Sequence, residues 1–405
     1  MDVTFLAGIT GFDKSDFVKQ FAKMCLRKNG YSDDLESPEA RRLIQYVKFE
    51  DELLREDETS TDIPGFLEKL SFREKCDTIE RTFKRIAKQL DPNTSHLFLD
   101  IHLSYYKRSG FIPPMSVANF RELVPRDETP VKIVTLIDDV FVIWKNLRAR
   151  EHKFPGTKLR LREILSWRSL EMLQAEAVAM NYTNEQRNVE NYLVAVRTPV
   201  ATLYNLTLRP RPLRAYLSFP ITRTRSKEES VKDINHFRTE VHGLASKHSV
   251  ALFDPVTIDE LALKIALEKS KARNEELVSL QNEMRWPLDS DEKMVRKPAW
   301  PIDVPKLEIE EVLPDINNNI RARDFKLIDN SRLTIAYRPY FGGESKGVRQ
   351  EMEYTVQQGK HVYAYDPKED SGSNSDPHPF DTNVVVNQNR QEFMETLERL
   401  FSAGY

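Results

Sequence analysis

The sequence predicts an α/β protein of two three-layer domains, each a parallel sheet between layers of helices. Short apolar strands alternate with amphipathic helices along most of the 405 residues, which is the pattern of parallel α/β sheets. The alternation stops at "LRPRPLR", 208–214, and then restarts. The two prolines of this segment block a regular helix and remove hydrogen-bond donors. We therefore expect a linker over 208–214 that separates a domain over 1–207 from a second domain over 215–405.

The first domain opens with the apolar strand "VTFLAG", which a helix from about 15 to 29 follows. After a charged stretch, "REKCDTIERTFKRIAKQL" is expected as a helix because Ile79, Phe83 and Ile86 share one face. Two buried strands, "HLFLDI" and "VKIVTLI", come next. We expect one long helix over roughly 162–195 to complete this domain.

The second domain repeats the alternation with different motifs. The segments "RAYLSFP" and "VALFDP" are expected as strands on either side of a helix over roughly 228–247. The next pair of strands, "RLTIAY" and "KHVYAYDP", encloses a helix from about 346 to 358, and "NVVV" and a final helix over 389–402 follow. The segment 285–308 is rich in proline and charge and is expected as an inserted excursion, and 370–381 as a flexible loop.

Composition excludes several classes of function. The 60 basic and 63 acidic residues give a net charge of −3, which argues against a broad nucleic-acid-binding surface. Two cysteines, Cys25 and Cys76, supply no disulfide framework, which fits a reducing compartment. No run approaches 18 apolar residues, and the first residues lack the pattern of a secretory signal. We expect a cytoplasmic protein with no membrane and no nucleic-acid partner.

The segment "GITGFDKS" lies between the first strand and the first helix and nearly matches the phosphate-binding pattern G-x-x-x-x-G-K-[ST]. Gly8 and Gly11 would let backbone N–H groups converge on a phosphate, and Lys14 would neutralise its charge. Ser15 and Asp100, which ends the strand "HLFLDI", would hold the Mg²⁺ that accompanies ATP. Taken alone, the segment is equally compatible with an ordinary strand–turn–helix connection.

The order of motifs over roughly 1–205 resembles that of the archaeal-type adenylate kinases, which are P-loop nucleoside monophosphate kinases. The matching residues are Asp100-Ile-His102, Gly110-Phe-Ile-Pro113, and Ala175, Ala179, Met180 and Tyr182 at the end of a helix. The resemblance implies ATP and nucleoside monophosphates as ligands. It also implies an arginine-rich lid that stabilises the transferred phosphoryl group, for which the candidates are Arg148, Arg150, Arg160 and Arg162.

Asp13 departs from this pattern because it stands where the loop has its second glycine. A carboxylate there adds repulsion close to bound phosphates, and it supplies a Cβ where the loop usually needs none. We therefore expect weakened ATP binding. The sequence is compatible both with phosphoryl transfer and with nucleotide binding without transfer.

The most informative stretch of the second domain is "ESKGVRQEMEYTVQQGKHVYAY". Val348, Met352 and Val356 recur every four residues and predict a helix with a buried stripe. Ser345 precedes this helix, where backbone N–H groups attract phosphate. Glu351 lies about one turn in, near the strand ends where open α/β sheets bind ligands. A simpler interpretation is that Glu351 is an acid that the helix dipole favours.

The pattern S-x-G-V-x-x-E after a strand resembles the nucleoside 2-deoxyribosyltransferase superfamily, and most closely its 2′-deoxynucleoside 5′-monophosphate N-glycosidase branch. The likeness spans about 213–366, with Glu351 at the position of the catalytic glutamate and Asp324 on the upstream acid. It implies a flavodoxin- or Rossmann-like domain, a homo-oligomer and no cofactor. The implied substrate contacts are Tyr216, Ser218 and Arg223 on the first strand and its loop, and Ser345 and Gly347.

Two departures loosen this resemblance. Arg332 stands where the family often has an acid, and the segment 339–344 is a few residues longer, which changes the spacing from Asp324 to Glu351. Asp329 is a second candidate for the acid.

The chemistry that the resemblance implies is cleavage of an N-glycosidic bond. Glu351 would be the nucleophile that traps or stabilises an oxocarbenium-like carbon, and Asp324 would supply the proton that the departing base needs. Water would make the enzyme a hydrolase, and a second base would make it a transferase. Ser345 and Arg223 suit a 5′-phosphate, which favours nucleoside monophosphates and hence hydrolysis.

We therefore expect a nucleotide-processing enzyme in which a P-loop kinase-like domain is fused to a nucleotide N-glycosidase domain. The alternatives are an active nucleoside monophosphate kinase, a nucleoside deoxyribosyltransferase, and a regulatory protein that senses nucleotides at both sites without turnover. Salvage, nucleotide clean-up and deliberate nucleotide depletion are all compatible with these activities.

Overall fold

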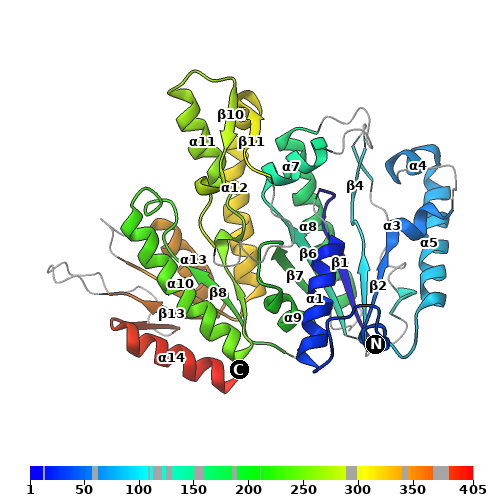
Figure 1. Cartoon of the computed structure of the whole chain (residues 1–405), viewed down its shortest axis with the longest axis horizontal. Helices are drawn as coiled ribbons and strands as arrows, with labels where there is room; N and C mark the ends of the chain where they lie inside the picture. Colours follow the sequence, from blue (N-terminus) through cyan, green and yellow to red (C-terminus); the bar gives the residue numbers. More distant parts are fainter. Residues whose placement is uncertain are drawn as a thin grey trace. The chain divides into compact units, whose positions relative to one another are not determined.

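The fold is α/β, with two five-stranded parallel sheets (Figure 1). A computed structural model describes residues 1–11, 14–56, 63–107, 110–112, 121–124, 130–149, 159–184, 189–209, 211–288, 299–339, 345–367 and 383–404.

The chain forms two compact units that interleave along the sequence. Unit 1 comprises Met1–Val196, Glu260–Asn282 and Val295–Asp315, and unit 2 comprises Arg197–Asp259, Glu283–Met294 and Ile316–Tyr405. The sequence predicts a single division at 208–214, whereas each of these units combines several segments of the chain. The expected domain limits of 1–207 and 215–405 stay a prediction.

Unit 1 holds most of the elements of the N-terminal half and two segments from farther along the chain. Its strands are β1 (Asp2–Ala7), β2 (Ile44–Lys48), β3 (His96–Asp100), β4 (Tyr105–Lys107), β5 (Gly110–Ile112), β6 (Val131–Ile137), β7 (Val189–Ala195), β10 (Leu277–Leu280) and β11 (Ile302–Pro305). Its helices are α1 (Lys14–Lys28), α2 (Pro38–Leu43), α3 (Phe49–Leu54), α4 (Ile63–Lys69), α5 (Phe72–Gln89), α7 (Val140–Ala149), α8 (Leu161–Asn184), α11 (Leu261–Lys271) and the first part of α12 (Lys306–Asn330).

The main sheet of unit 1 has the order β2-β3-β1-β6-β7, with every pair parallel. One face packs on α3, α5 and α8, because the alternate residues Val3 and Phe5 of β1 share a core with Phe83 of α5. On the opposite face, Phe21 of α1 meets Phe98 of β3 edge to face, with ring centroids 4.8 Å apart. The central strand β1 thus lies between two layers of helices, one on each face of the sheet.

Unit 2 contains the second parallel sheet and its helices. Its elements are α9 (Val200–Leu208), β8 (Arg214–Ser218), α10 (Glu228–His248), β9 (Ala251–Phe253), the 3₁₀ turn Pro255–Thr257, the second part of α12, β12 (Leu333–Tyr337), α13 (Lys346–Gln357), β13 (His361–Tyr365), β14 (Val384–Asn387) and α14 (Arg390–Ala403).

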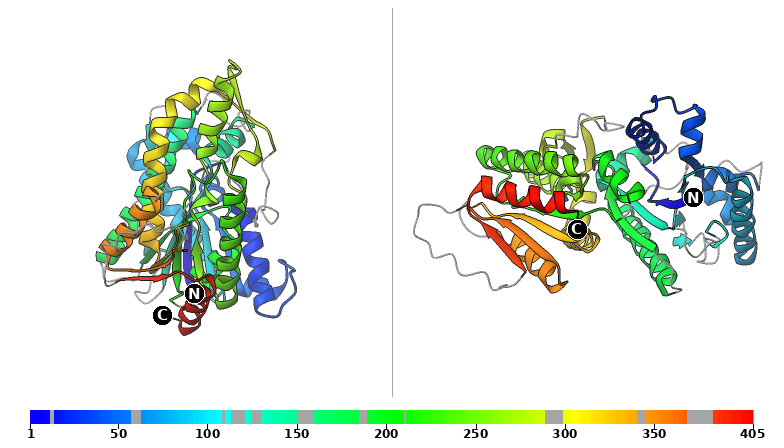
Figure 2. Two further views of the ribbon diagram at one scale, coloured as in Figure 1. Left: turned by 90° about the vertical axis from the view of Figure 1, so that its left-hand side faces the viewer. Right: turned by 90° about the horizontal axis from the view of Figure 1, so that it is seen from below.

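The sheet of unit 2 has the order β14-β13-β12-β8-β9, and all its pairs are parallel. The two faces of β8 have different neighbours, as the period of two requires. Ala215 and Leu217 share a core with residues of α10 and α14. On the other face, the next strand β12 meets α13, where Ala336 packs against Met352. Figure 2 shows α14 in red and α13 in orange on opposite sides of the strands.

The expectation of one helix over 162–195 was wrong. Helix α8 ends at Asn184, and the segment "VENYLVA" forms the edge strand β7, which pairs with β6 in parallel. Its Val, Tyr and Leu residues favour a pleated, half-buried surface over a helix. The charged stretch after α1 likewise contains the short strand β2.

None of the helices within the described ranges combines the length and the apolar character that crossing a lipid bilayer requires. The two longest, α8 and α12, each contain several charged residues.

Gly11 offers a test of how tightly the first loop packs. Its φ is +125°, and an added Cβ would lie 2.7 Å from Ile143 Cγ2 on α7. Gly30 also has a positive φ, +76°, but a Cβ there would meet nothing within 4 Å. We expect Gly30→Ala to cost about 1–2 kcal/mol from backbone strain. Gly11→Ala should cost roughly 1–3 kcal/mol more because Ile143 must move. Melting temperatures from circular dichroism compare the two variants, and equal losses would contradict the contact with α7.

Candidate active site

The carboxyl ends of β8 and β12 form the point in the unit 2 sheet where the strand order reverses. From β8 the chain continues through α10 to β9 on one side, and from β12 through α13 to β13 on the other. Open parallel sheets bind ligands in the crevice outside such a point. Ser218 is the last residue of β8, and Glu351 lies on the helix that follows β12.

Packing and hydrogen bonds fix α13 against this part of the sheet. Its first turn is capped by Ser345, whose Oγ accepts from the Val348 backbone N–H at 3.5 Å. One turn after Glu351, Thr355 Oγ1 lies 2.7 Å from Thr334 Oγ1 of β12 and also donates to the Glu351 backbone oxygen at 2.8 Å. The carboxyl group of Glu351 is therefore held over β8 and β12.

Ser218 and Tyr216 of β8 lie beside this carboxyl group. The Ser218 hydroxyl donates to Glu351 Oε2 at 2.5 Å. Tyr216 is two residues earlier on the same face of the strand and is fully buried. Burial, followed by the charges of Asp324 and Glu351, raises the pKa of the Tyr216 phenol well above its usual value. Tyr216 therefore keeps its proton.

The environment of Glu351 disfavours its charge. Burial of the carboxyl group, and next the negative charge of Asp324, raise its pKa to about 8. The Ser218 and Tyr216 hydroxyls and the Arg323 guanidinium oppose this rise in pKa but are weaker. The site thus favours the protonated form of Glu351.

Asp324 lies on α12 beside the same site, and its carboxylate pairs with the Arg323 guanidinium. Arg323 Nε and Nη2 both donate to Asp324 Oδ1, at 3.0 and 2.7 Å. A third donor of the same guanidinium, Nη1, binds the Ile258 carbonyl oxygen at 3.0 Å. Both side chains are buried, with 5% and 9% of their surfaces exposed. Sequence reasoning missed Arg323, although "RARDFK" places it directly before the predicted acid.

The residues expected to hold the phosphate lie at the rim. Ser345 and Gly347 sit at the start of α13, and a Cβ on Gly347 would meet only Ser345 Oγ, at 3.9 Å. Packing therefore does not require glycine there. Arg223 is exposed in the turn after β8. Ser345 is half-buried and Gly347 and Arg223 are exposed, so none of the three is enclosed in the core.

The other sequence features near this site have different outcomes. Asp329, the second candidate acid, is exposed and accepts a hydrogen bond from Tyr354 Oη at 2.8 Å. Arg332 is also exposed. Most of the longer segment, 340–344, lies outside the described residues.

In unit 1, the structure brings Gly8, Lys14 and Asp100 together at the ends of β1 and β3. Gly8 and Gly11 have φ values of +134° and +125°, which glycine adopts without strain. Lys14 Nζ lies 2.6 Å from Asp100 Oδ1 and donates to the carbonyl oxygens of Gly8 and Ile101 at 3.2 and 3.3 Å. Asp13, the residue that departs from the loop pattern, lies outside the described residues.

Two further acids lie near Lys14, and sequence reasoning missed both: Glu171 is buried, and Glu50 is half-buried. Glu171 of α8 accepts from the backbone N–H groups of Gly8 and Leu103, at 3.1 and 2.7 Å. Burial raises its pKa. Burial also raises the pKa of Glu50 to about 7, against the opposing charge of Lys14. Acids within helices, such as Glu171 in α8 and Glu50 in α3, give no sequence signal of such a role.

Three of the candidate lid arginines form ion pairs with acids on the first part of α12, all within unit 1. The partners lie three and four residues apart on one stripe of that helix. Two of the three pairs are largely exposed, so each contributes little on its own. The pairs are Arg148 with Glu308 at 3.3 Å, Arg160 with Glu311 at 2.9 Å and Arg162 with Asp315 at 3.0 Å; Arg150 lies outside the described residues.

The described residues contain no group of three or more His, Cys, Asp or Glu side chains arranged for a metal ion. Mg²⁺ bound with a nucleotide needs only one or two protein oxygens besides phosphates and waters. Ser15, in the first turn of α1, and Asp100 at the end of β3 supply oxygens of that kind. The donor set therefore fits nucleotide-borne Mg²⁺ and no dedicated metal site.

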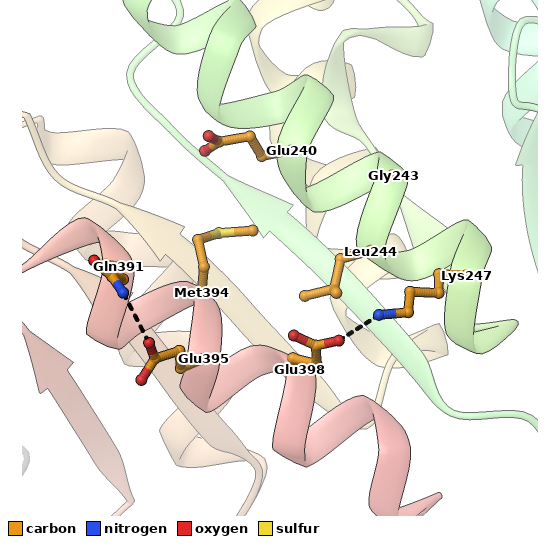
Figure 3. A pocket seen from close by; sticks show the side chains of 8 residues that line it. All are labelled: Glu240, Gly243, Leu244, Lys247, Gln391, Met394, Glu395 and Glu398. Atoms are coloured by element: carbon orange, nitrogen blue, oxygen red, sulfur yellow. Dashed lines mark hydrogen bonds and ion pairs between the residues drawn. The ribbon is translucent and has the colours of Figure 1, made fainter.

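A groove of about 390 Å³ lies elsewhere in unit 2, between α10 and α14 (Figure 3). Its walls include Leu244 and Met394, and Lys247 donates to Glu398 at 2.5 Å across it. It contains none of the residues that the sequence proposed for a site.

The chain matches no protein-family model, and no curated protein shows significant similarity to it. Its function must therefore be inferred from the site itself.

Glu351 gives a pH test of stability. Because its pKa is near 8 in the folded state and about 4.3 when unfolded, folding takes up a proton between these values, and stability falls as pH rises through that window. We expect Glu351→Gln to raise the melting temperature relative to the native chain, by an amount that grows from pH 5 to pH 8. The matched control is Glu353→Gln on the same helix, which removes a partly exposed ion pair with Arg349. A difference for Glu351→Gln that is constant with pH would contradict the raised pKa.

Proposed function

We propose that unit 2 hydrolyses the N-glycosidic bond of nucleoside 5′-monophosphates with Glu351 and Asp324 as its two catalytic carboxyl groups. One observation supports this most directly. The half-buried carboxyl group of Glu351 and the buried one of Asp324, from different helices, interact at the carboxyl ends of β8 and β12, beside the buried side chains of Tyr216 and Ser218.

The topology of unit 2 agrees with the proposed enzyme class. Numbered along the unit, its strands have the spatial order 2-1-3-4-5, which is the flavodoxin-like form of the doubly wound sheet. In this order, ligands bind between the first and third strands, which here are β8 and β12. Ser218 and Glu351 meet at that place.

The chemistry of the pair suits glycosidic cleavage. Breaking the bond develops positive charge on the sugar carbon and negative charge on the leaving base, so the site must offer both an anion and a proton. Glu351 with its raised pKa and Asp324 with its arginine partner are two carboxyl groups in different environments. Enzymes obtain an acid and a base from two residues of the same type by placing them in environments that move their pKa values apart.

The rim of the site supports a phosphorylated substrate. Ser345 and Gly347 mark the start of α13, and Arg223 is exposed beside β8. A helix start and an arginine both attract phosphate. Transfer of the sugar to a second base is the alternative outcome of the same chemistry.

Release of free base tests this proposal. The protein is incubated with a panel of ribo- and deoxynucleoside monophosphates, and the products are separated by chromatography. We expect free base from at least one nucleotide, and a loss of at least about 10²-fold in Glu351→Ala and in Asp324→Asn. Glu353→Ala, on the same helix, is the control and should retain activity. Binding of nucleotides without release of base would contradict the glycosidase and favour a sensor.

We propose as a second function that unit 1 binds a nucleotide through the loop that follows β1. The supporting observation is that Lys14 lies between Gly8 and Asp100 at the carboxyl ends of two neighbouring strands. Three acids surround this one lysine, so the charge of bound phosphates must be offset. Mg²⁺ held by Ser15 and Asp100 with the nucleotide supplies that offset.

Lys14→Ala tests the second function. We expect the variant to bind ATP at least tenfold more weakly than the native chain in calorimetry with Mg²⁺, because the loop loses its one buried cation. Lys19→Ala removes an exposed lysine of the same helix and is the control. Unchanged binding in Lys14→Ala would contradict a nucleotide site in this loop, and ATP-dependent formation of nucleoside diphosphate that Lys14→Ala abolishes would show kinase activity.

A further inference from the structure

We propose that Arg323 is a positioning residue that fixes the charges of the catalytic pair, so that Asp324 is the anion facing the sugar and Glu351 is the acid that protonates the leaving base. This inference rests on the proposed glycosidase function. It reverses the roles that the family resemblance implies, in which Glu351 is the nucleophile and Asp324 the proton donor.

The contacts of Arg323 indicate which of the two carboxyl groups is ionised. Two of its donors converge on one oxygen, Asp324 Oδ1, at 3.0 and 2.7 Å. The bond from its third donor to the Ile258 carbonyl oxygen ties the guanidinium to the backbone of the unit. With both side chains buried, water screens this pair little. A guanidinium in such contact strongly favours the ionised form of its carboxylate partner.

The contacts of Glu351 indicate which of the two carboxyl groups keeps a proton. Its partner is the Ser218 hydroxyl at 2.5 Å, a group that accepts a hydrogen bond as readily as it donates one. The titratable and charged groups that act on Glu351 are Tyr216 of β8 and Asp324 and Arg323 of α12. The negative charge of Asp324 disfavours a second negative charge on Glu351. Because Arg323 contacts Asp324, we assign the negative charge to Asp324 and the proton to Glu351.

The reaction then balances without a covalent intermediate. The C1′–N bond breaks, its electron pair leaves with the base, and the Glu351 proton goes to a ring atom of that base. The Asp324 carboxylate stabilises the cationic sugar carbon. Water adds its oxygen to C1′ and returns a proton to Glu351, so that free base and sugar 5-phosphate are the products and both carboxyl groups return to their starting states.

The pH profile of base release gives the first test. With Glu351 as the acid, the rate falls as pH rises through about 8, where the group loses its proton. With Glu351 as the nucleophile, the rate rises through the same pH. Arg323→Gln should move the acidic limb of the profile to higher pH by about one unit or more, because Asp324 becomes harder to ionise, whereas Arg323→Lys should move it less.

A substrate with an activated leaving group gives the second test. The probes are 4-nitrophenyl ribofuranoside 5-phosphate and its 2-deoxy analogue, whose leaving group needs no proton. Glu351→Gln should lose about 10²-fold or more on nucleotides but at most a few-fold on the nitrophenyl probe. Asp324→Asn should lose activity on both. Melting temperatures verify that the variants fold, and Arg321→Gln, an exposed arginine of the same helix, is the control.

The outcomes separate the two proposals. No base and no nitrophenol from the native chain would overturn the glycosidase itself. Release of base at a rate that rises through pH 8, or equal losses of Glu351→Gln on both kinds of substrate, would overturn the reversed roles alone. An Arg323→Gln profile that is lower at every pH but unshifted would leave Arg323 with a structural role only and would also overturn the inference.

Discussion

Two interacting carboxyl groups that are shielded from water do not readily carry two negative charges, and the site in unit 2 is organised around this constraint. Asp324 is buried and Glu351 is half-buried. Arg323 makes the two groups unequal because two of its donors contact Asp324. The sheet supplies the rest, since the parallel pairing of β8 and β12 places Ser218 beneath the helix that carries Glu351. The proposed division of roles follows from which carboxyl group the cation reaches.

The same constraint operates in unit 1 with a different result. There one buried cation, Lys14, faces three acids, Asp100, Glu50 and Glu171. Lys14 pairs directly with Asp100, while burial raises the pKa values of the other two. A nucleotide entering this loop would compete with Asp100 for the ammonium group, which makes the proposed dependence on Mg²⁺ a consequence of charge. In the proposed mechanism the two carboxyl groups of unit 2 differ in charge, whereas in unit 1 burial favours the neutral forms of two of the three acids.

Much of the fold was predictable because its signals are local. The strands β1, β3, β6, β8 and β12 are apolar runs, and α13 has a regular buried stripe. The prediction failed at β7, a half-buried edge strand that follows a long helix and resembles its continuation. For the site, the family resemblance pointed to Glu351, Ser218, Tyr216 and Asp324, which the structure brings together. Glu171 depends on contacts with residues far away in the sequence, which one sequence does not display. Arg323 lies beside its partner in the sequence, but adjacent charges on a helix give no signal of contact.

The adjacency of Arg323 and Asp324 has a consequence for how the site assembles. Neighbouring residues on a helix do not normally face each other, so their contact depends on the bend of the arginine side chain back along its own helix. An ion pair between consecutive residues needs no other part of the chain to bring its members within reach. The charge of the proposed anion thus depends on a contact within one helix, whereas Glu351 comes from a different helix and feels that charge across the site.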